Sequence, residues 1–117
     1  MWRKIKAEDK QYLNPFRLAD VLALLQVLAL DEHTHRSEEG LKSELQGAPK
    51  SGASWTEIAS VHPEFFRVRP EGTHTVSLVA RHVLPKDADE IRQLSPDFVG
   101  QLIATAVDLS RPADKAE

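Results

Sequence analysis

The chain has 117 residues, of which 41% are hydrophobic and 28% are charged, and its formal net charge is −3. These proportions are those of an ordinary folded protein, and the length suits one domain with a sizeable core. The absence of cysteine excludes disulfides, thiolate catalysis and cysteine-ligated zinc sites. The slightly acidic balance argues mildly against a strong nucleic-acid binder. The first residues show no apolar secretory segment, so we expect a cytoplasmic protein.

The longest apolar run lies at residues 17–30, RLADVLALLQVLAL. Asn14 followed by Pro15 predicts a helix start, because Asn accepts from an unpaired amide and Pro needs no partner at the first position. One broad half of this helix carries Leu18, Val21, Leu22, Leu24, Leu25 and Leu28. Asp20 and Gln26 lie on the other side. The width of this apolar face predicts a central core helix that is covered on more than one side. The alternative is that the face forms an interface between subunits of an oligomer. The helix is too short to span a bilayer.

Two shorter helices are predicted next. Ser37 is a candidate N-cap for a helix at about residues 38–46, where Leu41 and Leu45 would face the core. Ser54 and Glu57 form a capping-box pattern for a helix at about residues 55–61. The stretch between Leu30 and Ser37 is polar and has room for one very short strand.

A β-hairpin is predicted after these helices. Apolar and polar residues alternate at 66–69 and again at 74–81, and a Pro/Gly turn at 70–73 separates the two runs. Such a pattern is typical of two antiparallel strands.

The last predicted element is an amphipathic helix at residues 97–109, with a start signal at Ser95-Pro96. One of its faces carries Phe98, Leu102, Ala106 and Leu109. We divide the chain into an N-terminal extension (1–13), a main domain (14–84), and a linker, C-terminal helix and tail (85–117).

The order of helix, short helix, capped helix and hairpin resembles the winged-helix (winged helix-turn-helix) superfamily over roughly residues 15–84. The resemblance is carried by Leu41 and Leu45, by the capped SWTEI start at residue 54, and by the HPEFFRV link at residues 62–68. It implies an α+β fold with three helices, a two-stranded antiparallel wing and an additional C-terminal helix. In such proteins an appended helix often serves dimerisation. We therefore expect a homodimer through Phe98, Leu102, Ala106 and Leu109.

Winged helices that bind DNA place the third helix in the major groove and the hairpin on the backbone or in the minor groove. The resemblance thus implies nucleic-acid contacts at five residues, Lys50, Thr56, Ser60, Arg67 and Arg69, with Arg81 and His82 as weaker candidates. DNA is favoured over RNA. This chain departs from the pattern, because no Arg or Lys lies between Lys50 and Arg67 and because Glu57 would repel phosphate.

Sequence motifs give no sign of an enzyme. The chain has no GxSxG, GxGxxG, P-loop or HExxH motif, so we predict no catalytic residues and no cofactor. His33 and His35 are the one close histidine pair, and since no third ligand accompanies them we predict no metal site. His62 is predicted to be a packed or capping residue. Trp55, Phe65, Phe66 and Phe98 are predicted to lie in the core rather than to form a base-stacking surface.

Two hypotheses about function follow. The first is a nucleic-acid-binding, transcription-regulator-like winged helix, motivated by the architecture and by Lys50, Arg67 and Arg69. The second is a protein–protein interaction or scaffold domain, which docks or dimerises through the C-terminal helix without binding nucleic acid. The third helix, which carries no Arg or Lys, favours the second hypothesis, and the wing favours the first.

Overall fold

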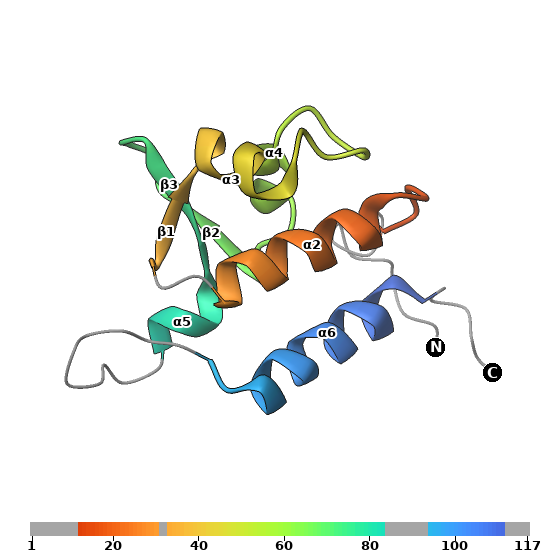
Figure 1. Cartoon of the computed structure of the whole chain (residues 1–117). Coiled ribbons are helices and arrows are strands. Elements are labelled where there is room, and N and C mark those ends of the chain that lie inside the picture. The colour runs from red at the N-terminus through yellow and green to blue at the C-terminus, as the bar shows by residue number, and fades with distance from the viewer. Residues whose placement is uncertain (1–11, 31–32, 84–93, 112–117) are drawn as a thin grey trace.

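A computed structural model of the chain describes residues 12–30, 33–83 and 94–111 (Figure 1). The elements in chain order are α2 (Arg17–Leu30), β1 (His35–Ser37), α3 (Glu38–Leu45), α4 (Trp55–Ser60), β2 (Phe66–Val68), β3 (His74–Leu78), α5 (Val79–Val83) and α6 (Pro96–Ser110). The mixture of helices and one small antiparallel sheet is an α+β fold. The predicted extension at residues 1–13 lies outside the described residues except for its last two, and so does the predicted linker up to residue 93.

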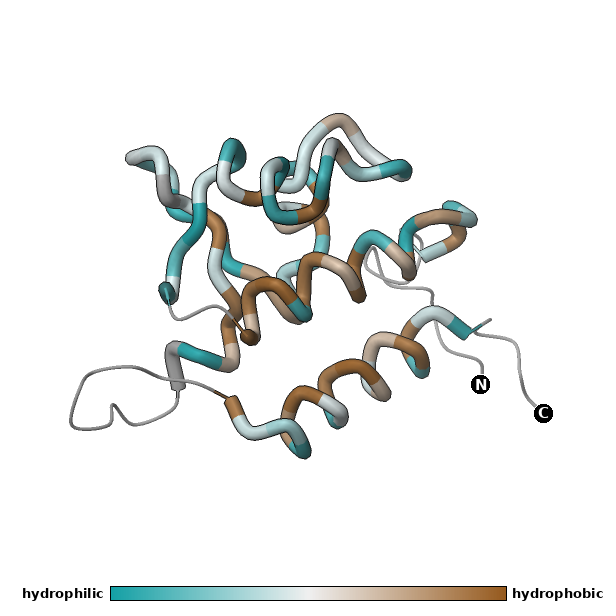
Figure 2. Tube along the Cα trace, in the orientation of Figure 1, coloured by the Kyte–Doolittle hydropathy of each residue, from teal (hydrophilic) through white to brown (hydrophobic). Residues whose placement is uncertain are grey.

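Helix α2 is the centre of the core, as its wide apolar face predicted. Val21, Leu24, Leu25 and Leu28 are completely buried. The strands lie with α3 and α4 on one side of α2, and helix α6 lies on the other (Figure 1). Hydrophobic residues occur along much of both α2 and α6 (Figure 2). The predicted Asn14 contact is present, since the amide of Phe16 donates to Asn14 Oδ1 over 3.0 Å, but α2 begins at Arg17 rather than at Pro15.

The sheet has the strand order β1-β3-β2, and both pairings are antiparallel. Because partners across a ladder point to the same face, Val76 and Leu78 of β3 share the core face with Val68 and Phe66 of β2. On the opposite face, which we call the outer face, Ser77 lies between His35 of β1 and Arg67 of β2.

The second strand is shorter than the alternation predicted. The sequence suggested a strand through Arg81, but β3 ends at Leu78 and residues Val79–Val83 form helix α5. The reason is the length of β2. Leu78 pairs with Phe66, the first residue of β2, and the amide of Val79 makes one further ladder bond to the carbonyl of Phe65, at the point where α5 begins.

The predicted helix starts are confirmed by their caps. Ser37 Oγ accepts from the amide of Gly40, Ser54 Oγ accepts from the amide of Glu57, and Ser95 Oγ accepts from the amide of Phe98. The reciprocal half of the capping box differs from the prediction. The carboxylate of Glu57 accepts from the amide of Ala53 rather than from that of Ser54.

Helix α6 packs on α2 of its own chain. Ala106 is completely buried, and Phe98, Leu102 and Leu109 are partly buried against the core cluster. The face that the sequence assigned to dimerisation is therefore part of the internal core, because α2 exposes apolar residues that α6 covers.

The prediction that the aromatic residues lie in the core is confirmed. Trp55, Phe65 and Phe66 are buried, and Phe98 is partly buried against the core cluster.

Candidate nucleic-acid interface and a buried polar network

The structure separates the five predicted nucleic-acid contacts into two groups. Arg67 lies on β2 and Arg69 directly follows it, and both are exposed. Lys50 is exposed in the loop between α3 and α4, Ser60 is exposed at the end of α4, and Thr56 is half-buried in its first turn. The structure thus brings the two arginines together on one element, and the other three residues belong to α4 and the loop before it.

Arg67 and Arg69 lie on the outer face of the sheet. Their neighbours Phe66 and Val68 pack toward the core, and side chains alternate along a strand. The amide of Arg69 donates to the carbonyl of Thr75 over 2.9 Å, which extends the β2–β3 ladder beyond Val68. The backbones of residues i and i+2 in a strand, such as Arg67 and Arg69, lie about 6.6 Å apart. Each guanidinium presents a planar set of donors that matches a phosphate group.

The amino terminus of α4 is occupied by a carboxylate of the same chain. Glu38 of α3 accepts from the amides of Trp55 and Thr56 over 2.9 and 2.8 Å. It also accepts from the hydroxyl of Thr56 over 2.7 Å. The hydroxyl proton of Thr56, which was predicted to contact nucleic acid, is thus used in a bond to Glu38. A carboxylate at this end of the helix satisfies the positive helix terminus and repels phosphate.

Arg81 is not a surface residue, which corrects its assignment as a weaker phosphate contact. Its side chain is 0% exposed. Nη1 donates to the carbonyl of Leu28 over 3.0 Å and to the carbonyl of His33 over 3.1 Å. Arg81 thus joins α5 to the end of α2. The side chain of His82, the other weaker candidate, lies outside the described part of the chain.

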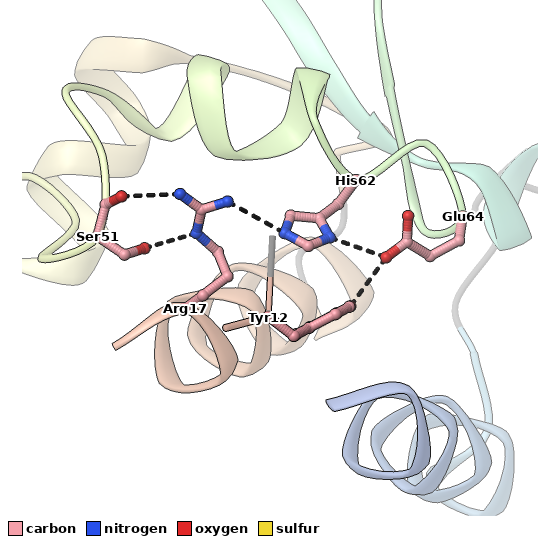
Figure 3. Close-up of polar contacts among 5 residues, drawn as sticks. All are labelled: Tyr12, Arg17, Ser51, His62 and Glu64. Carbon is pink, nitrogen blue, oxygen red and sulfur yellow. Dashed lines mark hydrogen bonds and ion pairs between the residues drawn. The ribbon is translucent and has the colours of Figure 1, made fainter. Parts of the chain in front are cut away.

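A chain of buried polar side chains links the residues before α2 to the corner between α4 and β2 (Figure 3). The hydroxyl of Tyr12 donates to Glu64 Oε2 over 2.9 Å, and His62 Nδ1 lies 2.8 Å from the same oxygen. His62 Nε2 lies 3.3 Å from Nη1 of Arg17. A neutral ring with its proton on Nδ1 satisfies both contacts, because it then donates to Glu64 and accepts from Arg17.

The same chain continues into the loop before α4. Arg17 donates from Nε to Ser51 Oγ over 2.7 Å and from Nη2 to the carbonyl of Ser51 over 2.8 Å (Figure 3). Asp20 accepts from the amides of Lys50 and Ser51 and from the hydroxyl of Ser51. Arg17 and Asp20 interrupt the apolar run of α2 in the sequence, and both are buried. They fix the backbone of the loop that carries Lys50.

His62 is a packed residue, as predicted, and its burial decides its role. The side chain is 0% exposed and both ring nitrogens have partners within the chain. A general base must reach a substrate proton, directly or through one water. His62 therefore holds the fold together through its bonds to Glu64 and Arg17, and its buried ring is not placed to act as a general base.

The electrostatics of Glu64 follow from this arrangement. Burial raises the pKa of its carboxyl group, but the bonds from His62, the backbone amide and Tyr12 outweigh burial and hold the pKa below the ordinary value of 4.5. The other oxygen of this carboxylate, Oε1, is buried and bonds to none of the described residues.

Replacing Glu64 by glutamine is expected to make folding less sensitive to acid. A carboxyl whose pKa is lower when folded stabilises the protein above its unfolded pKa and loses this contribution as the pH falls through the folded pKa. The stability difference between the original chain and Glu64→Gln should thus be largest near neutral pH and shrink below about pH 5. Urea denaturation across this range measures it. A difference that grows toward acid pH would contradict the assignment.

The described residues hold no group of three or more His, Asp, Glu or Cys side chains arranged to bind a metal ion. His33 is exposed and precedes β1, while His35 begins the strand. The neighbouring acids Asp31 and Glu32 lie outside the described residues.

No family model matches this sequence, and neither a curated protein nor a solved structure is significantly similar to it. Among the helices that the structure describes, none is both long and apolar enough to cross a membrane.

Proposed function

We propose that the chain is a small, non-enzymatic binding module of the winged-helix type that binds nucleic acid, with DNA favoured over RNA, in the cytoplasm. The element order supports this architecture, since α2, α3, α4 and the β2–β3 hairpin follow one another in the order that the resemblance implies. Strand β1 differs from the two-stranded wing of that resemblance, because it pairs with β3 as a third strand.

The observation that carries the proposal is the pair Arg67 and Arg69. Both are exposed, both lie on the outer face, and they are held by the ladder that joins β2 to β3. Arginine forms bidentate bonds with phosphate groups, and phosphate contacts supply most of the affinity of sequence-independent nucleic-acid binding. Lys50, whose backbone is fixed by Asp20, is a third exposed cation.

The double substitution Arg67→Ala plus Arg69→Ala is expected to weaken binding to mixed-sequence duplex DNA and to lower its salt dependence. Two lost phosphate contacts should reduce the slope of log K against log salt by about 1.8. Fluorescence anisotropy between low and near-physiological salt measures both quantities.

The matched control is Lys42→Ala plus Arg111→Ala, which removes the same charge from two exposed positions on α3 and after α6. This variant should retain the original slope. Equal losses in the two variants would show that net charge, and not the wing, is responsible.

A protein-interaction role is the second candidate, and one observation favours it. A groove of about 230 Å³ is lined by Gln26, Val27, Leu30 and Glu44, and Leu30 is 65% exposed. A partner protein seated there would cover apolar surface that α6 leaves open. Absence of nucleic-acid binding even at low salt, with the fold intact, would favour this second role.

A further inference from the structure

We infer that the outer face of the sheet binds the phosphate backbone of a nucleic-acid duplex without reading its base sequence, and that α4 stays out of the groove. The inference rests on the proposed function and specifies its ligand. It departs from the arrangement implied by the resemblance, in which the third helix reads bases.

The outer face carries polar side chains on all three strands. His35, Ser77 and Arg67 form one row across β1, β3 and β2, and Thr75 and Arg69 form the next. Ser77 is completely buried, which leaves His35, Thr75 and the two arginines at the surface. Two arginines whose backbone positions are about 6.6 Å apart along a strand suit a repeating anion better than a single phosphate ion.

The aromatic residues of this region point away from the outer face. Phe66 and Phe65 are buried in the core, and the outer-face positions of the described strands carry no Phe, Tyr or Trp. Proteins that bind single strands stack bases on aromatic side chains. This face offers only cationic and hydrogen-bonding groups, so it is suited to a duplex, whose phosphates lie outside and whose bases are already stacked.

Helix α4 is poorly equipped to read bases. Trp55, Ile58 and Ala59 are buried, and the positions that remain are Thr56, Glu57 and Ser60. None of them is an Arg, Lys, Asn or Gln, the residues that make bidentate contacts with purines. Glu57 adds a carboxylate, and Glu38 places another at the start of the helix. Insertion of α4 into a groove would bring these two negative charges close to phosphates.

Two single substitutions test the outer face and α4 separately. Each adds one negative charge, so the two variants differ only in where that charge lies. Thr75→Glu places the charge on the outer face, and Ser60→Glu places it at the exposed end of α4. Binding to labelled mixed-sequence duplex DNA should weaken about tenfold with Thr75→Glu and change less than about twofold with Ser60→Glu. Thr75→Lys should tighten binding and raise the salt slope by about 1, which guards against a loss caused by misfolding.

The ligand class is tested with four further probes of equal length: an A·T duplex, a G·C duplex, a single-stranded DNA and a duplex RNA. Similar affinities for the two DNA duplexes and weaker binding of the single strand are expected. Comparable binding of duplex RNA would identify the shared phosphate backbone as the ligand, and a preference for DNA would assign the site to B-form duplexes.

Some results would contradict only the inference about the outer face, and others would contradict the proposed function. A Ser60→Glu loss as large as that of Thr75→Glu, or a preference above about tenfold between the A·T and G·C duplexes, would overturn this inference and leave the proposed function standing. Tighter binding of the single strand would do the same. Failure of the folded protein to bind any of the probes at low salt would overturn the proposed function itself.

Discussion

Replacing Arg81 by alanine is expected to lower the free energy of unfolding by about 4 kcal/mol. The last four carbonyls of a helix have no partner within the helix, and the carbonyl of Leu28 is one of those in α2. The last turn of α2 contains no basic residue of its own. The buried guanidinium of Arg81 satisfies this carbonyl and that of His33, so its loss leaves both without that donor and opens a cavity.

Arg81→Met separates the two contributions, because methionine restores most of the volume and none of the donors. We expect it to cost about 3 kcal/mol, and chemical denaturation with both variants measures the difference. Arg81→Lys should recover only part of the loss, since an ammonium cannot reproduce the planar geometry of the guanidinium. A cost below about 1 kcal/mol for Arg81→Ala would show that water replaces these bonds.

Replacing Asp20 by alanine is expected to cost about 3 kcal/mol, the second largest effect. Its carboxylate accepts three hydrogen bonds from residues 50 and 51, and it is buried near the start of α2. Removal leaves those donors without their acceptor. It also removes a negative charge from a network that contains the guanidinium of Arg17, which is bonded to the same serine.

Amide hydrogen exchange gives a local readout of the Asp20 prediction. The amides of Lys50 and Ser51 should exchange faster in Asp20→Ala, while those in the middle of α2 should follow the global stability. Asp20→Asn is the control. It keeps the size and one acceptor oxygen, and we expect about half the cost. Unchanged exchange at both amides would contradict the role of Asp20 as the anchor of this loop.

These two predictions concern the same feature, a core helix whose ends are joined to distant segments by buried charges. Arg17 and Asp20 hold the loop before α4 at one end, and Arg81 holds α5 at the other. The loop carries Lys50, and the stretch that leads into α5 includes the hairpin. The buried polar groups therefore position the surfaces that we propose bind a ligand.

The sequence by itself determined the elements that depend on neighbouring residues. Each cap predicted at Ser37, Ser54 and Ser95 is present, because a cap joins residues three positions apart and needs no tertiary partner. The hairpin and the burial of Trp55 and Phe66 were predictable for a related reason, since alternation and helical spacing show which side of an element is apolar.

Only the tertiary structure decided which polar groups are buried and which face of each element is left for a ligand. Glu38 reaches α4 across 17 and 18 residues, Asp20 reaches Ser51 across 31, and Arg81 reaches Leu28 across 53. No local pattern distinguishes these residues from surface charges, because a charge is stable inside a protein only when a particular distant partner meets it. The same holds for α6, whose apolar stripe suits a dimer or an internal helix equally well until α2 is placed beside it.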